Sequence, residues 1–551
     1  MTDTPASLDI DRFSELARAE GVDDYTSDHR VGEDNIRALG LDVHNPVFVV
    51  SGTTIVCFVA FALAFPTVAA DVFGQWRVTL TTQLDWFFMA VANAVLLFCG
   101  LLVFSPLGSV RLGGPDARPR YSYPSWVAML FAAGIGIGIM FYGVLEPMTH
   151  ALTPPLSAGG VTGTERRDLA MAATIYHWAF HPWAIYSLVG LSLAFFSFNK
   201  GLPLVIRSAL YPIFGERTWG WPGHVVDVLA VFATLFGLAT SLGFGAEQAA
   251  GGIAYLFGIP NANWLRVVVI TVITALALGS VLRGLDGGIK VLSELNMGAA
   301  AVLGLFVLAL GPTWDILAGM VEYSGAYLRY LPELSNWVGR DDAYYMHDWT
   351  TFYWAWWIAF SPFVGMFIAR ISSGRTVREF IVAALLAPSA IFILWMTIFG
   401  ETAMDQYFLE GWQGVARTVR DFKPELTLFV FLEQFPLTLL TSALGVVLVL
   451  VFFVTSMDSG SLIVDTMTAG GKIETPVGQR IFWCIFLGLL GVALMLGGGL
   501  TSLQALALAS AFPFSLVMLL MMVSLYRGLR AERRLLAVVE DAEADVKSGG
   551  D

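Results

Sequence analysis

The chain has 551 residues, of which 56% are hydrophobic and only 14% are charged, and its mean hydropathy is +0.69. Long uncharged stretches recur along it, so the composition excludes an ordinary soluble enzyme and indicates an integral membrane protein. The net charge of −13 comes largely from acidic residues near the two ends, and no basic face that would bind nucleic acid is visible.

The pattern of apolar residues predicts transmembrane helices. A helix needs about 20 predominantly apolar residues to cross a bilayer, and the sequence contains twelve such stretches. We therefore predict an all-α integral membrane protein with twelve transmembrane helices. The predicted spans cover residues 47–69, 84–105, 125–149, 169–198, 225–257, 264–283, 297–320, 349–372, 380–402, 436–466, 479–500 and 504–527.

Basic residues predict the orientation of these spans. Lys and Arg are concentrated after even-numbered spans, such as Arg118 and Arg120 after span two, so the positive-inside rule places both termini in the cytoplasm of a multi-pass plasma-membrane protein. Spans 3–7 and 8–12 make two sets of five, and an odd number of helices per set requires two inverted five-helix repeats. The expected organisation is an acidic cytoplasmic N-terminal tail (1–45), two peripheral spans (46–124), a first repeat (125–320), an interfacial helix or loop (321–348), a second repeat (349–527) and a short cytoplasmic C-terminal tail (528–551).

Two spans carry signs of interrupted helix. The run from Ala132 to Pro147 in span three contains four glycines, each costing about 1 kcal/mol relative to alanine inside a helix. In span eight, Ser361 and Pro362 interrupt a long apolar run. Irregular backbone within a membrane is tolerated only where protein buries it or a cavity adjoins it. Interrupted spans in corresponding positions of two halves therefore predict the substrate site of a secondary transporter.

Aromatic residues cluster inside spans four and eight. At about 100° per residue, Trp178, Trp183 and Tyr186 fall within about 140° of helix surface, and Trp357 and Phe360 share a face of span eight. A quaternary ammonium ion donates no hydrogen bonds and binds to the faces of aromatic rings. The pattern indicates a cation cage, with tight aromatic packing as the alternative. A substrate carboxylate would meet the backbone N–H groups at the glycine break.

Other polar residues offer weaker candidates. Acids within spans, including Glu146 and Asp458, are candidate proton sites. His177 and His181 have the spacing of a zinc pair, but no third ligand stands nearby in the sequence, and we expect them to pack in the core. Hydroxyls in the stretch 452–461 would either bind a monovalent cation together with freed carbonyls of span three, or bond to their own helix backbone.

Five segments carry a resemblance to a known family. They are the glycine run with Glu146 and Pro147, the segment from His177 to Tyr186, the segment from Leu285 to Lys290, the segment from Thr455 to Ser459, and WTTFYWAWWIAFSPFVGMFIARISSGRTVR at 349–378, the most specific of the five. Together they resemble the betaine/choline/carnitine transporter family, from Asn45 to about span twelve. The resemblance implies a transporter of small trimethylammonium compounds, not an enzyme, and a homotrimer.

The resemblance also implies site residues. The aromatic box would comprise Trp178, Trp183, Tyr186 and Trp357, and the central site Trp356, Trp357 and Phe360, with Ala133, Ile135 and Gly136 facing the ligand. Phe360 stands where glycine betaine carriers commonly have tryptophan. A sodium site would use the carbonyls of Ala132, Ile135 and Phe452 with the hydroxyls of Thr455 and Ser456.

The resemblance also has implications for ion coupling, which rest on Gly138 and Leu238. Gly138 resembles the sodium-coupled glycine betaine carriers, because proton-coupled choline carriers tend to hold an acid there. A second sodium site would involve Thr234 and Phe363, although Leu238 stands where those carriers have a threonine.

We therefore expect a sodium-coupled importer of glycine betaine or a close analogue, working by alternating access in osmoprotection, with sodium as coupling ion and no other cofactor. The alternatives are an ion-independent carnitine or choline exchanger, proton-coupled choline uptake, and, from other classes, a membrane-embedded enzyme using the paired histidines or a channel.

Overall fold

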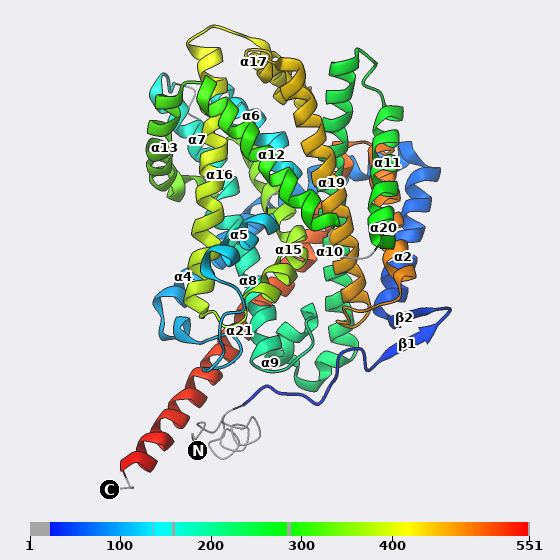
Figure 1. Cartoon of the computed structure of the whole chain (residues 1–551), viewed down its shortest axis with the longest axis vertical. Helices are drawn as coiled ribbons and strands as arrows, with labels where there is room; N and C mark the ends of the chain where they lie inside the picture. Colours follow the sequence, from blue (N-terminus) through cyan, green and yellow to red (C-terminus); the bar gives the residue numbers. More distant parts are fainter. Residues whose placement is uncertain (1–22, 135, 157–159, 284–287, 549–551) are drawn as a thin grey trace.

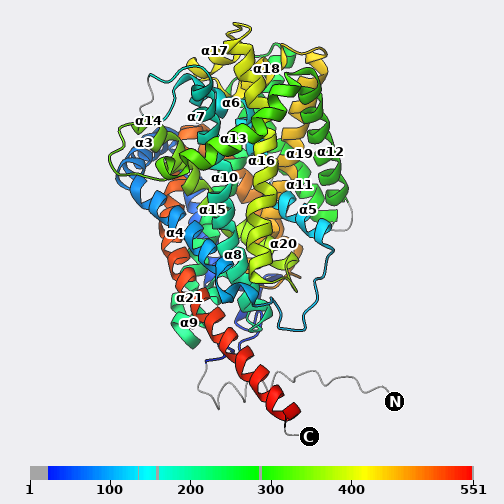
Figure 2. The ribbon, with the colours of Figure 1, turned by 90° about the vertical axis from the view of Figure 1, so that its left-hand side faces the viewer.

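The computed structural model describes residues 23–134, 136–156, 160–283 and 288–548 as a bundle of long helices (Figures 1 and 2). Within these residues, eleven helical stretches are long and apolar enough to cross a membrane, which confirms an all-α multi-span membrane protein. These stretches are α2 (Val47–Ala64), α4 (Asp85–Phe104), α7 with α8 (Thr164–Trp178 and Phe180–Phe198), α10 (Trp221–Phe257), α11 (Asn263–Arg283), α12 (Gly288–Leu310), α14 with α15 (Ala343–Tyr345 and Thr351–Ile371), α16 (Val377–Phe408), α19 (Thr438–Thr468), α20 (Val477–Leu496) and α21 (Leu500–Ser548).

The predicted third span is broken, as expected from its glycines. Helix α5 (Tyr123–Gly134) and helix α6 (Ile137–Leu152) occupy it, and each is too short to cross a bilayer alone. Gly136 between them has extended backbone, with φ −151° and ψ −158°. Ile135 and residues 284–287 lie outside the described residues, and so do residues 285–287 of the segment from Leu285 to Lys290.

The predicted break in span eight is wrong. Helix α15 runs through Ser361 and Pro362 without interruption. Proline has no N–H to donate to the carbonyl four residues earlier, but the Ser361 hydroxyl donates to that carbonyl, on Ile358, at 2.8 Å. The freed acceptor is thereby satisfied inside the apolar bundle, and the helix continues.

Span four is interrupted instead. Helix α7 ends at Trp178 and α8 begins at Phe180, with Ala179 at φ −96° and ψ −116° between them. Pro182 cannot donate to the carbonyl of Trp178 four residues earlier, so the α-helical ladder lacks a bond at this point. The sequence allowed a kink here; the structure has a break.

The segments outside the spans are more ordered than predicted. Within the expected acidic tail, β1 (Asn35–Ala38) and β2 (Leu41–His44) form an antiparallel hairpin in which Asn35 pairs with His44. The hairpin is fastened to the bundle because Asp42 forms an ion pair with Lys472 at 2.8 Å. At the other end of the chain, α21 continues far beyond the predicted span and projects from the same end of the bundle as the hairpin (Figures 1 and 2).

A helix occupies much of the segment expected to form an interfacial helix or loop, but it begins earlier, as α13 (Thr313–Leu334), and it packs against α7 and α16. Helix α3 (Pro66–Gln83) connects the first two spans. Three further short α-helices are α9 (Tyr211–Phe214), α17 (Gly414–Arg420) and α18 (Thr427–Leu432). The described residues also form short 3-10 helices at Pro106–Ser109, Ile206–Leu210, Gly215–Trp219 and Pro424–Leu426, and a π-helical turn at Met346–Thr350. Helix α17 lies at the end of the bundle opposite the hairpin (Figure 1).

Helix α15 stands at the centre of the bundle. It packs against α8, α10 and α21, and the whole stretch from Thr351 to Ala359 is buried. A helix that is apolar around its full circumference requires neighbours on every side, and this stretch has them. Helices α11 and α12 are peripheral and expose large apolar side chains such as Leu276 and Leu305, which suit contact with lipid.

Candidate functional site

Four rings predicted to form an aromatic box do meet. Trp178 lies at the end of α7, Trp183 and Tyr186 lie in the first turns of α8, and Trp357 faces them from α15, all of them buried. The centroid distances are 5.2 Å between Trp178 and Trp357, 5.9 Å between Tyr186 and Trp357, and 5.5 Å between Trp183 and Tyr186, at interplanar angles of 78° to 90°. We call these four residues the aromatic cage.

A fifth ring joins the cage from a helix that the sequence did not indicate. Phe392 of α16 lies 5.3 Å from Trp178 and 6.2 Å from Trp183 between ring centroids. Nothing in the local sequence distinguishes Phe392 from the other phenylalanines of that span, because its role follows only from how α16 packs on α7 and α8.

The predicted central residues divide into two groups. Trp356 stacks on Trp357 at 5.0 Å and 15°, so it adjoins the cage, and its Nε1 donates to Ser241 Oγ at 3.2 Å. Phe360, which is half-buried, contacts Phe363 at 5.1 Å, and among the described residues this is the ring contact that it makes. The structure therefore brings Trp356, but not Phe360, against the cage rings.

Glycines let the broken span approach the cage. A Cβ added at Gly138 would lie 2.7 Å from Trp178 Cη2 and 3.2 Å from Trp356 Cη2, so the rings pack directly on the α6 backbone. A Cβ at Gly136 would meet no atom within 4 Å, so open space adjoins the break. Ala132 and Ala133 lie in the last turn of α5, next to this space in the chain.

Side chains from other helices fasten the first turn of α6. Trp395 Nε1 donates to the Ile139 carbonyl at 2.9 Å, and Gln248 Nε2 donates to the Met140 carbonyl at 2.7 Å. The N–H groups at the start of α6 have no partner within their own helix and carry the positive end of its dipole. The break therefore holds a fixed set of donors beside the cage.

Three residues of the predicted sodium site, Phe452, Thr455 and Ser456, lie on α19, which contacts α6, while Ala132 lies on α5 and Ile135 is outside the described residues. The Thr455 hydroxyl donates to the carbonyls of Val451 and Phe452, each at 3.1 Å, so it adopts the bond to its own helix that was the alternative to cation binding. Ser456 is half-buried beside it. Phe452 thus supplies a carbonyl and Thr455 a hydroxyl at one place on the helix.

The residues of the predicted second sodium site lie where α10 meets α15. The Thr234 hydroxyl is buried without a hydrogen-bond partner among the described residues. Phe363 lies half-buried on α15. The Leu238 side chain packs against Gly460 of α19, where an added Cβ would lie 2.5 Å from a Leu238 methyl group. Leucine at this position therefore fills space and offers no oxygen.

A cavity of about 230 Å³, lined by apolar and polar side chains, lies on the α17 side of the cage. Its rim includes the ion pair of Arg77 with Asp348 at 2.7 Å, and its lining includes Tyr142 and Phe352. Tyr142 contacts Trp178 at 5.9 Å, and Phe352 stacks on Trp356. These two rings therefore separate the cavity from the cage in this conformation.

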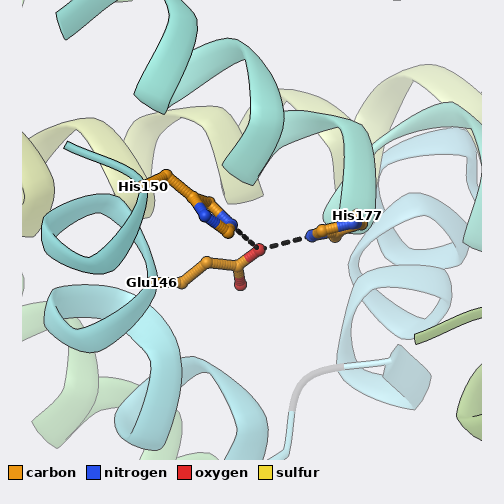
Figure 3. Close-up of side chains that lie close together, drawn as sticks. All are labelled: Glu146, His150 and His177. Atoms are coloured by element: carbon orange, nitrogen blue, oxygen red, sulfur yellow. Dashed lines mark hydrogen bonds and ion pairs between the residues drawn. The ribbon is translucent and has the colours of Figure 1, made fainter. Parts of the chain in front are cut away.

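The two candidate zinc histidines do not share a site. The break at Ala179 separates them: the His181 ring stacks on Trp354 and its Nε2 lies 2.9 Å from Asn93 Oδ1. His177 instead meets Glu146 and His150 of α6, a grouping that sequence spacing did not reveal (Figure 3). From the sequence, Glu146 is one of several acids within spans that are candidate proton sites, and it belongs to a segment that carries the family resemblance.

The fold and the buried cage beside a broken helix define a multi-pass membrane transporter. A family model described as BCCT, betaine/carnitine/choline family transporter, matches residues 46–534. The chain belongs to this family, which confirms the resemblance predicted from its motifs.

Three relatives illustrate the similarity. The chain is 50% identical to a glycine betaine/proline/choline transporter of Vibrio parahaemolyticus, over 96% of this chain and 98% of the relative. It is 48% identical to a glycine betaine/proline/choline/ectoine transporter of the same species, over 92% and 91%. It is 42% identical to the glycine betaine transporter OpuD of Bacillus subtilis, over 84% and 90%. These relatives are transporters, as predicted, and not enzymes.

Proposed function

We propose that the protein imports glycine betaine or a closely related quaternary-ammonium solute, coupled to sodium, by alternating access. The observation that carries this proposal is the convergence of Trp178, Trp183, Tyr186 and Trp357 in one buried cage beside the break between α5 and α6. The transported solutes named for the relatives support it, since glycine betaine is common to all three.

The chemistry of the cage suits a trimethylammonium group. Such a group carries a positive charge but no N–H, so ring faces stabilise it by about 0.5 to 2 kcal/mol per contact, more when water is excluded. A carboxylate on the same solute would accept hydrogen bonds from the first-turn N–H groups of α6. The trimethylammonium end of glycine betaine would thereby be recognised by rings of α7, α8 and α15, and its carboxylate end by the start of α6.

The rings that separate the cage from the cavity on the α17 side support alternating access. In this conformation the cage rings contact one another, and Tyr142 and Phe352 lie between them and the cavity on the α17 side. A solute that enters from that side requires these two rings to move. Subsequent exit toward the opposite end would use the open space beside Gly136.

Sodium coupling is supported by Gly138 and by the oxygens of α19. Contact of Gly138 with the rings of Trp178 and Trp356 leaves no room for an acidic side chain that would carry a proton. The Phe452 carbonyl and the Thr455 hydroxyl would join carbonyls at the end of α5 around the ion. One sodium ion driven by a tenfold gradient and about 100 mV would sustain roughly 500-fold accumulation of a neutral zwitterion.

The proposal includes cytoplasmic termini, two inverted repeats and a homotrimer. Basic residues between spans contact elements at the hairpin end of the bundle, including Lys472 with Asp42, Arg207 with His44, and Lys200 with Glu532 of α21. This concentration at one end supports a cytoplasmic location for it. Labelling of single cysteines placed in the hairpin and in α17 from either side of intact cells would test the orientation.

Uptake into proteoliposomes tests the function. We expect glycine betaine uptake that requires a sodium gradient and is abolished by Trp357→Ala. Trp354→Phe is the matched control, because Trp354 lies on the same helix, stacks on His181 and has an indole N–H without a partner among the described residues. Uptake by Trp357→Ala at the wild-type affinity would refute the cage, and sodium-independent uptake would refute the coupling.

A further inference from the structure

A buried carboxylate adjoins the cage and receives several hydrogen bonds. Glu146 of α6 is fully buried, and its Oε1 lies 2.6 Å from His177 Nδ1 and 3.4 Å from His150 Nε2 (Figure 3). Its Oε2 accepts the indole N–H of Trp178 at 2.7 Å and the hydroxyl of Tyr353 at 2.5 Å. One side chain of the broken span thus holds groups from α7 and α15.

The two histidines are the groups among the described residues that can pair with this carboxylate, and each carries a positive charge only when it is protonated. A buried carboxylate is costly unless it is paired with a cation and hydrogen-bonded. Among the described residues, the ion pairs of Glu146 are made with His150 and His177. The second nitrogen of His177, Nε2, lies 3.0 Å from the hydroxyl of Thr350, so the imidazole is held at both ends. Glu146 and His177 therefore form a fixed pair.

Two cage rings are oriented by this pair. The indole of Trp178 is fixed by its bond to Glu146, while its far edge packs on Gly138. The indole of Trp357 is fixed by a bond from its Nε1 to the backbone carbonyl of His177 at 2.9 Å. Because cation binding depends on the direction of the ring faces, the pair of Glu146 with His177 determines how two of the four rings are presented.

We propose that Glu146 is a positioning residue for the cage: through its bond to Trp178 and its ion pair with His177, it sets the orientation of Trp178 and Trp357 for the bound ammonium group. This inference rests on the proposed function, since it concerns affinity for the solute that the cage binds. A purely structural role would affect how much folded transporter is obtained, without a specific change in its affinity.

The test measures KM and maximal rate of sodium-driven glycine betaine uptake by the full chain in proteoliposomes. Glu146→Gln keeps the size of the side chain but removes its charge, and we expect KM to rise about tenfold, the effect of losing a hydrogen bond to a charged group. Trp178→Phe keeps a ring without the N–H and should raise KM similarly. If the two act through one bond, the double variant also shows about a tenfold rise, whereas independent effects multiply to about a hundredfold.

Glu401→Gln is the matched control. Glu401 of α16 is another buried acid, paired with Arg167 of α7 at 2.8 Å. Its variant should alter the amount of folded protein but not KM. If Glu146→Gln does not fold, Tyr353→Phe removes another donor to the same oxygen and should raise KM.

Two outcomes would overturn the inference: an unchanged KM in Glu146→Gln, or in Tyr353→Phe where that variant is used, and multiplicative effects in the double variant. The proposed function fails separately, when Trp357→Ala retains wild-type uptake. Loss of uptake in Trp357→Ala together with an unchanged KM in Glu146→Gln therefore removes the positioning role and leaves the cage.

Discussion

Acidification should loosen the N-terminal segment from the bundle. His44, at the end of β2, is 1% exposed, and its Nε2 lies 3.1 Å from Arg207 Nη1 and 3.2 Å from His224 Nδ1. Burial and the neighbouring Arg207 guanidinium lower the pKa of His44 to about 3, from 6.5. The docked segment therefore holds His44 neutral throughout the neutral and mildly acidic range.

The size of the effect follows from linkage. Between pH 6.5 and 3 the detached segment binds a proton at His44 that the docked segment does not, so docking weakens as the pH falls. From about pH 7 to 5.5, this difference amounts to about 1.3 kcal/mol, or roughly an eightfold shift toward detachment. His29, which stacks on Trp219, has its pKa lowered by burial and by Arg207 and adds to the effect in the same direction.

Hydrogen–deuterium exchange of the hairpin amides measures this equilibrium. After correction for the intrinsic pH dependence of exchange, protection of residues 35–44 should fall roughly eightfold or more from about pH 7 to 5.5. His44→Gln, which cannot be protonated, should show a smaller fall, with His29 and His224 as remaining contributors, since burial and Arg207 lower the pKa of each. Equal protection at the two pH values in the wild-type protein, or greater protection in acid, would refute the reasoning.

Three further substitutions have definite expected outcomes. Gly138→Ala places a methyl group 2.7 Å from Trp178, an overpacking that costs about 1–3 kcal/mol, so KM for uptake should rise about fivefold or more; an unaffected KM would contradict the packing. Lys200→Met leaves Glu532, which is 4% exposed, without its cationic partner at 2.6 Å and with the Asn199 amide still donating to it at 3.0 Å; thermal unfolding should show about 3–5 kcal/mol of lost stability, and an unchanged melting temperature would refute the importance of the pair. Thr376→Ala removes the capping box of α16 and should cost about 0.5–2 kcal/mol in the same assay, whereas an unaltered melting temperature would show that the cap is dispensable.

The positions of most spans could be predicted because the length of an apolar stretch is a local property. The break between α5 and α6 was predictable for the same reason, since glycines accumulate where regular helix is not needed. The two prolines show the limit of such reasoning. Pro182 and Pro362 remove the same kind of bond, yet only Pro362 has a serine immediately before it whose hydroxyl replaces that bond. Helix α15 therefore continues, while the fourth span divides at Ala179.

Helical periodicity and the family resemblance indicated the four cage residues. Neither indicated the side chains that hold the cage rings in place. Glu146 bonds to residues 31 to 207 positions away in the chain, and spacing along one helix carries no information about such contacts. Phe360 shares a helical face with Trp357 but contacts Phe363 among the described residues. Helix α10 packs tightly against α15 at Phe360, because a Cβ added at Gly237 of α10 would lie 3.0 Å from the Phe360 backbone nitrogen.

The break at Ala179 has a mechanical consequence for the cage. Trp178 belongs to α7, and Trp183 and Tyr186 belong to α8, so the rings of the cage are carried by two separate helices that are joined at one residue. A small rotation of α7 relative to α8 at Ala179 would widen or narrow the space between the cage rings without unwinding either helix. Helices α7 and α8 can thus keep their shape while the distance between the cage rings that they carry changes.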